Sequence, residues 1–242
     1  MLKIFVFVLV FLGALIEVSY AQKNIQNQTL MWETFSVSGA IKKYPVQIEL
    51  QQRHYINPIA QHQFLVRGQV GKSISHNWRI ALGGAFFLQS PNDPKTTHRL
   101  AVPEIRPHVE AVYQQNASKT NISHRYRLET RIYHKQSPDK KELVDGYFYN
   151  NMRLRYRLQA VIPTTRFLSK HVAINVSNEV HLNIGEKIKY NVFDQNRLYG
   201  GLAVSRRKSQ YEVGYLNWFQ QQSSGIDFYN RHILRLGFNY KM

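Results

Sequence analysis

The sequence predicts an all-β fold: an antiparallel transmembrane β-barrel of about 10–12 strands that follows an N-terminal signal peptide. Three observations lead to this fold class. The chain starts with a short apolar segment that is typical of export. Apolar and polar residues then alternate with a period of two along most of the chain, as they do in strands. No later stretch is apolar over the ~18 residues that would indicate a spanning helix.

The first 21 residues have the pattern of a secretory signal peptide. Lys3 gives the short N-terminal region a positive charge, and residues 4–16 are almost continuously apolar. Small residues then precede a cleavage point before Gln22. A membrane anchor is the alternative, but the apolar run is shorter than the ~20 residues that a spanning helix needs. We therefore expect residues 1–21 to be a signal peptide and residues 22–242 to form one outer-membrane β-barrel.

Composition limits the classes of function. The 242 residues contain 32 Lys and Arg against 15 Asp and Glu, a formal net charge of +17, and no Cys. Without Cys there is no disulfide scaffold, thiolate metal site or Cys nucleophile. The positive charge taken alone favours nucleic acid as a partner. Export removes that partner, so we expect no nucleic acid and instead a place in a bacterial envelope.

The alternation is clearest in residues 151–162. Leu154 and Leu158 lie on one face of the predicted strand, whereas Arg155 and Arg157 lie on the other. A helix would mix these two sets around its surface, and a strand separates them. In a barrel within a membrane, the apolar set would face lipid and the arginines would face the lumen.

The same pattern defines ten segments of roughly barrel-spanning length. In chain order, with one apolar residue set against one residue of the other face, they are 44–53 (Ile48 against Glu49), 64–70 (Val66 against Arg67), 78–89 (Ile80 against Arg79), 105–113 (Val109 against Glu110), 122–132 (Leu128 against Glu129), 151–162 (Leu154 against Arg155), 172–182 (Val180 against Glu179), 197–206 (Leu198 against Arg197), 211–219 (Val213 against Glu212) and 231–240 (Leu234 against Arg235).

An eleventh segment, residues 28–40, is also strand-like and precedes a tight turn at Lys42 and Lys43. Bacterial barrels with both termini in the periplasm have an even number of strands. The sequence leaves three arrangements open for this segment. It closes the barrel as an odd extra strand, lies in the lumen, or forms two short strands.

The connections between the predicted strands alternate in length. Short connections are expected at 71–77, 115–121 and 206–209, and longer ones at 89–104, 134–146, 183–196 and 220–230. Long extracellular loops and short periplasmic turns are typical of outer-membrane barrels, so we expect the C-terminus in the periplasm. The final strand ends in alternating apolar and aromatic residues. It resembles the C-terminal signal that the barrel-assembly machinery recognises, and we expect that machinery as a partner.

A set of charged residues is predicted to face the lumen: Arg106, Arg125, Arg127, Glu129, Arg131, Arg153, Arg155, Arg157, Glu179, Arg197, Glu212 and Arg235. Two interpretations remain open. Arg–Glu pairs between neighbouring strands, for example Glu129 with an arginine of residues 151–162, could fill the lumen and leave a structural role. Alternatively, the surplus of arginine could make a narrow, anion-favouring pore for small anions. Lysines in the predicted loops favour contact with outer-membrane lipid, including lipopolysaccharide phosphates.

The sequence leaves two other classes of function to consider. A soluble periplasmic β-sandwich that serves as a binding module would bury the apolar faces instead of exposing them. An outer-membrane lipid-modifying hydrolase would need a nucleophile, a base and an orienting group within reach of each other. Ser75-His76 and Ser123-His124 are adjacent pairs whose side chains would point to opposite faces of a strand. We therefore expect no enzymatic activity, no catalytic residues, no metal and no cofactor.

Several short motifs carry a resemblance to a known family: Trp32, Glu49 and Arg53, Glu104-Ile105-Arg106, Ser177-Asn178-Glu179, Asn196-Arg197-Leu198-Tyr199-Gly200-Gly201 and Glu212-Val213-Gly214-Tyr215. Together they resemble domain-of-unknown-function family 2490, outer-membrane β-barrels common in Bacteroidetes-type bacteria. The resemblance covers most of the chain after the signal peptide. It implies a barrel fold and an outer-membrane location, and it implies no activity.

Overall fold

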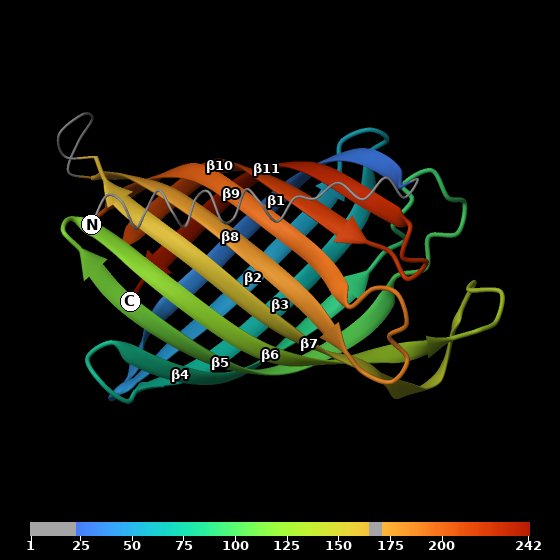
Figure 1. Cartoon of the computed structure of the whole chain (residues 1–242), viewed down its shortest axis with the longest axis horizontal. Helices are drawn as coiled ribbons and strands as arrows, with labels where there is room; N and C mark the ends of the chain where they lie inside the picture. Colours follow the sequence, from blue (N-terminus) through green and yellow to red (C-terminus); the bar gives the residue numbers. More distant parts are fainter. Residues whose placement is uncertain (1–22, 165–170) are drawn as a thin grey trace.

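The computed structural model describes residues 23–164 and 171–242, and the predicted signal peptide lies outside this part of the chain. Within it, eleven strands close into one barrel (Figure 1). None of the described residues forms a helix that is long and apolar enough to cross a membrane. The fold class predicted from the sequence is therefore confirmed.

Every one of the ten predicted strands lies within an observed strand. The strands are β1 (Asn24–Ile41), β2 (Tyr44–Tyr55), β3 (Ala60–Ser73), β4 (Trp78–Gln89), β5 (Val102–Ala117), β6 (Thr120–Gln136), β7 (Leu143–Pro163), β8 (Val172–Ile184), β9 (Phe193–Arg206), β10 (Ser209–Gln221) and β11 (Asp227–Lys241). Several extend beyond the predicted bounds, because polar residues continue the ladders past the apolar alternation.

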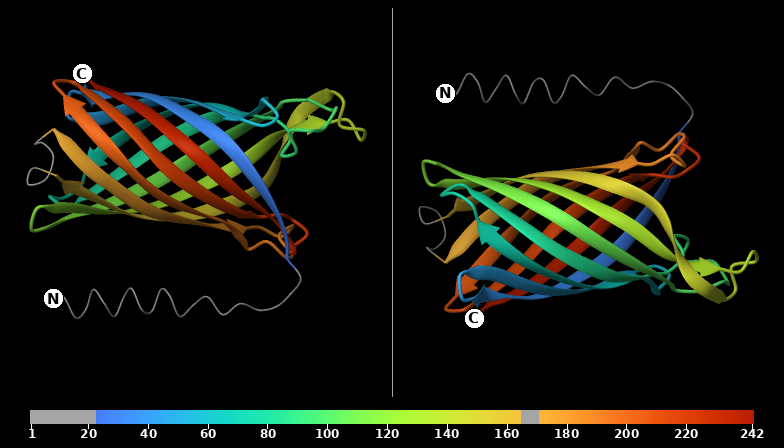
Figure 2. Two further views of the ribbon diagram at one scale, coloured as in Figure 1. Left: turned by 90° about the horizontal axis from the view of Figure 1, so that it is seen from above. Right: turned by 90° about the horizontal axis from the view of Figure 1, so that it is seen from below.

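The barrel closes in an unusual way for a bacterial barrel. Consecutive strands pair antiparallel, but β1 and β11 pair in parallel, with Asn24 opposite Asp227 and Ser38 opposite Lys241. Segment 28–40 is therefore the extra closing strand, and its placement in the lumen or as two short strands is wrong. The expectation of an even strand number is also wrong, because a parallel closure accommodates an odd number. As a result, β1 starts at the end of the barrel opposite to the C-terminus (Figure 2).

The two ends of the barrel differ in their connections. We call one the turn end, with residues 42–43, 74–77, 118–119 and 207–208 and the C-terminus, and the other the loop end, with residues 56–59, 90–101, 137–142, 185–192 and 222–226. In the two-residue turns, Lys42, Ser118 and Arg207 adopt φ values of 56°, 57° and 53°. A left-handed backbone conformation in a two-residue turn matches the right-handed twist of the two strands that the turn connects. The predicted alternation of short and long connections is thus present, apart from the short connection 56–59 at the loop end and the longer connection 164–171 between β7 and β8.

The distribution of side chains is the reverse of that in a soluble protein. Leu82 and Ile48 face outward with 67% and 62% of their surface exposed, whereas Arg231 and Glu104 lie in the interior with 0% exposed. Outward aromatic rings also contact each other near the turn end, where the ring centres of Trp78 and Tyr113 lie 5.1 Å apart. A β-sandwich would bury the apolar face, so the periplasmic sandwich interpretation is wrong.

Candidate functional site: the arginine-rich lumen

All of the residues predicted to face the lumen lie on the inward side of their strands. Buried ones are Arg106, Arg125, Arg127, Glu129, Arg153, Arg155, Glu179 and Arg197. Partly exposed ones, which line interior cavities, are Arg131, Arg157, Glu212 and Arg235. The period of two places them there, because residues i and i+2 of a strand share a face.

One wall of the lumen, formed by β5 to β9, is a connected network of arginines and carboxylates. The Glu129 carboxylate accepts hydrogen bonds from Arg153 Nε at 2.7 Å and from Arg155 Nη1 at 3.0 Å. Arg155 also lies 2.7 Å from the Glu179 carboxylate, which accepts a bond from Arg125 Nη2 at 2.5 Å. Each arginine here thus contacts a carboxylate of a different strand, which fixes the strands relative to one another.

Sequence reasoning missed two carboxylates of this network. Glu104 is fully buried and accepts bonds from Arg106 Nε at 2.6 Å and Arg131 Nε at 2.7 Å. Asp194 accepts a bond from Arg153 Nη1 at 2.7 Å. Glu104 stands two residues before Arg106, so the alternation could have assigned it to the lumen. Asp194 fell within a predicted loop, and a shift of register in β9 hides it from a strict period of two.

The opposite wall, formed by β1, β2 and β9 to β11, holds its arginines on aromatic rings. The guanidinium carbon of Arg53 lies 3.6 Å from the centre of the Trp32 ring. Those of Arg197 and Arg231 lie 4.3 Å and 4.5 Å from Trp218. None of these three arginines forms a salt bridge within the described part of the chain. Cation–π contacts compensate part of the cost of burying their charges.

Two cavities lie on either side of the lumen's centre. The turn-side cavity has a volume of 390 Å³, and the loop-side cavity one of 500 Å³. Between them, a void of only 80 Å³ remains among Arg53, Arg155, Glu179 and Arg197. The centre of the barrel is therefore almost filled by charged side chains.

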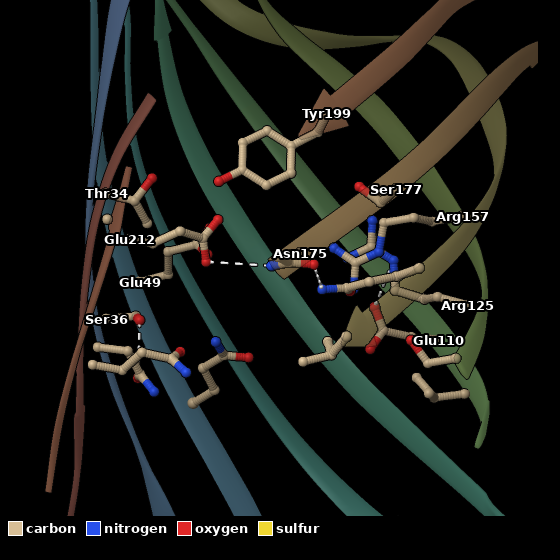
Figure 3. Close-up of a pocket in the computed structure, with 18 of the residues that line it drawn as sticks. Thr34, Ser36, Glu49, Glu110, Arg125, Arg157, Asn175, Ser177, Tyr199 and Glu212 are labelled. Carbon is tan, nitrogen blue, oxygen red and sulfur yellow. Dashed lines mark hydrogen bonds and ion pairs between the residues drawn. The ribbon is translucent and has the colours of Figure 1, made fainter. Parts of the chain in front are cut away.

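The turn-side cavity contains two arginines, Arg157 and Arg79, that lie outside the network of ion pairs. Figure 3 shows Arg125 and Arg157 on one wall of this cavity, with Glu49 and Glu212 across from them. Arg157 and Arg79, which both line the cavity, have no hydrogen-bond or ion-pair partner among residues 23–164 and 171–242. This chamber thus has a net positive lining that is accessible to small solutes.

A loop crosses the mouth at the loop end. Within the 90–101 connection, the Asn92 carbonyl accepts hydrogen bonds from Tyr55 Oη at 2.8 Å and from Gln28 Nε2 at 2.7 Å. Its side-chain oxygen accepts a third bond from Arg231 Nη2 at 3.1 Å. Asn92 therefore ties this loop to inward residues of three strands.

The serine and histidine pairs do not form a catalytic arrangement. Ser123 lines the turn-side cavity, whereas His124 points outward, with its Nδ1 2.9 Å from Tyr156 Oη. Ser75 and His76 lie in a turn, where Ser75 Oγ accepts a bond from the Trp78 backbone N–H. The described residues contain no group of three or more His, Asp or Glu side chains that could hold a metal ion.

Comparison with known proteins identifies the family. The model of the family described as "Protein of unknown function (DUF2490)" matches residues 29–230. The chain belongs to this family. A solved structure described as the NanC porin resembles this DUF2490 protein with a TM-score of 0.51 and 11% identity, over 88% of this chain and 99% of that one. At this identity the likeness concerns the fold alone. Among curated proteins, none matches the chain.

Proposed function

We propose that this DUF2490 protein is an outer-membrane barrel whose lumen is a narrow, anion-favouring passage, with a centre that is nearly closed in the conformation described. The observation that carries the proposal is the excess of inward arginine over inward carboxylate. The inward arginines are Arg53, Arg67, Arg79, Arg106, Arg125, Arg127, Arg131, Arg153, Arg155, Arg157, Arg197, Arg231 and Arg235. The inward carboxylates are Glu49, Glu104, Glu110, Glu129, Glu179, Asp194 and Glu212.

The proposed membrane location rests on the outward face. Exposed side chains such as Leu82, Ile48 and Leu198 would each cost about 25 cal/mol per Å² of apolar surface if they faced water. Lipid removes that cost, and a closed barrel satisfies its backbone hydrogen bonds internally, as the bilayer requires. The C-terminus and the short turns then face the periplasm. Lysines of the loops, such as Lys187, would lie near lipid headgroups and phosphates.

The proposed selectivity for anions rests on the inward arginines that form no ion pair with a carboxylate. Arg153 and Arg155 are engaged by carboxylates, so they hold the wall together more than they act on solutes. Arg157 and Arg79 are unpartnered among the described residues and line a chamber open to small solutes. A ring of positive side chains favours anions over cations in a pore. The small central void limits the proposed passage to small anions.

Single-channel recording in planar bilayers tests the proposal. We expect a small conductance whose reversal potential in a salt gradient indicates anion preference. Arg157→Gln should reduce this preference, and a variant that also carries Arg79→Gln should reduce it further. Lys187→Gln, in a loop outside the lumen, is the matched control and should leave the reversal potential unchanged. Silent membranes at verified insertion would refute the pore and leave a structural role.

A further inference from the structure

The outward face of the barrel is not uniformly apolar. Around the β1–β11 closure, the half toward the loop end carries polar side chains on neighbouring strands, which we call the seam patch: Asn196, Asn217, Asn230, His232, Thr29, Glu33, Gln52 and His54. On the far side of the barrel, the outward residues of the corresponding half are mainly apolar, as Phe86, Ile105 and Leu154 illustrate. The polarity is thus confined to one side.

Glu33 is the outward residue of the seam patch that is least suited to contact with lipid. It pairs with Leu236 of β11 and with Gln52 of β2, and the next outward residues on its own strand are Met31 and Phe35. The carboxylate therefore has apolar neighbours on its own strand and on β11, polar ones only on β2, and lies away from either edge of the outward apolar surface. A carboxylate that faces hydrocarbon at such a depth is costly, and such residues usually mark function or contact with protein.

The barrel itself satisfies Glu33 only in part. His54 Nδ1 lies 3.5 Å from Glu33 Oε2, which is itself covered by the barrel and accepts no hydrogen bond from any described residue. Both side chains remain accessible from outside, at 41% for Glu33 and 29% for His54. The accessible acceptor is therefore the other carboxylate oxygen, Oε1, which lies on the outward surface beside the imidazole of His54.

The amides of the seam patch form hydrogen bonds with amides on neighbouring strands. Asn217 Nδ2 donates to Asn230 Oδ1 at 2.7 Å, and Asn230 Nδ2 donates to Asn27 Oδ1 at 2.9 Å. Gln52 Nε2 donates to Gln61 Oε1 at 2.6 Å. Each amide has two donor hydrogens and two acceptor lone pairs, so these bonds leave groups available. Lipid acyl chains cannot form hydrogen bonds with those groups, whereas a protein surface that carries donors and acceptors can.

We propose that the seam patch is a membrane-embedded interface with a second copy of this chain, an inference that rests on the proposed membrane location. A two-fold interface brings the same surface of each subunit together, so the patch must complement itself. The seam patch meets this condition, because it contains the acid Glu33, the base His54 and amides that both donate and accept. In the dimer, the imidazole and amides of one copy would supply donors to the Glu33 carboxylate of the other.

Single-cysteine crosslinking tests the interface on the intact protein in native outer membranes. The chain contains no Cys, so each introduced thiol is the sole one. Gln52→Cys places it in the seam patch, and Thr130→Cys places it on the outward face of β6, in the loop-side half of a strand away from the seam. With a short bismaleimide, we expect dimers from Gln52→Cys and monomers from Thr130→Cys.

A second variant ties the dimer to Glu33. Glu33→Leu in the Gln52→Cys background should lower the crosslinked fraction several-fold. Heat-modifiable gel mobility shows independently that the barrel is folded. Equal crosslinking at Gln52 and Thr130, absence of crosslinks at Gln52, or a crosslinked species of another mass would overturn the proposal.

The same membranes separate this inference from the proposed function. Crosslinked dimers with a silent lumen would refute the pore and support the interface. An anion-selective conductance without seam crosslinks would support the pore and overturn the interface. Recovery of the folded chain in the soluble periplasmic fraction would refute the membrane location, and both proposals would fail for that reason.

Discussion

Replacing Glu129 with Gln tests whether the charged network stabilises the barrel. The substitution keeps the shape of the side chain and removes one negative charge from a carboxylate that is 3% exposed. Arg153 and Arg155 both donate to it, and Arg106 Nη1 lies 3.8 Å away. Breaking a buried ion pair from one side costs about 3–5 kcal/mol, because it leaves charge uncompensated. Since Asp194 and Glu179 still hold the two donors, we expect the lower end, about 3 kcal/mol.

Urea unfolding of the protein in lipid vesicles measures this effect. Trp32 and Trp218 are buried in the lumen, so their fluorescence reports loss of the interior. We expect the midpoint for Glu129→Gln to fall well below that of the parent chain with an unchanged slope. Glu142→Gln, in an exposed loop, is the control and should unfold as the parent does. A Glu129→Gln midpoint equal to that of this control would refute the view that Glu129 organises the network.

Three further predictions concern a loop contact, a closely packed glycine and the orientation of the barrel. Asn92→Ala removes the acceptor for Arg231 Nη2, and we expect noisier and larger conductance in planar bilayers as the 90–101 loop loosens; an unchanged trace would contradict its role at the mouth. Gly214→Ala should destabilise the barrel in the urea assay, because an added Cβ would lie 2.6 Å from the Gly200 backbone oxygen, whereas Gly200→Ala meets nothing within 4 Å and should be neutral. Trypsin added to whole cells should cut at Lys140 or Lys141 in the 137–142 loop and spare Arg207 and Lys208 in the opposite turn; the reverse pattern would invert the proposed orientation.

The sequence predicts the barrel wall well because one physical rule governs it. Every second residue of a strand faces the same side, so Arg153, Arg155 and Arg157 had to share a face whatever their partners were. The direction of that face followed from the second premise, export to a place with an outer membrane. The period of two carries no information about how β1 meets β11. That pairing joins residues about two hundred positions apart, and its parallel direction emerged only from the closed structure.

Individual partners inside the lumen were less predictable than the face. The sequence predicted that Glu129 could pair with an arginine of the 151–162 strand, and the structure contains that contact with Arg153. It did not indicate that Arg53 stacks on Trp32, because the sequence left the place of residues 28–40 open. The two residues meet as direct partners in the ladder between β1 and β2. Asn92 likewise lies in a loop without periodicity, where no pattern could indicate its bonds to Tyr55 and Arg231.

The two walls of the lumen supply part of the positive charge of the chain, because their arginines outnumber their carboxylates. Carboxylates on β5 to β9 pair with most of the arginines there, although Arg157 on β7 and Arg197 on β9 form no ion pair among the described residues. Aromatic rings on the other wall hold Arg53, Arg197 and Arg231 without removing their charge. A lumen built only for stability would have little reason to hold cations in this way, since apolar residues of similar volume are often as stabilising as buried ion pairs. Retention of uncompensated guanidinium groups therefore favours a role in which the interior acts on anions.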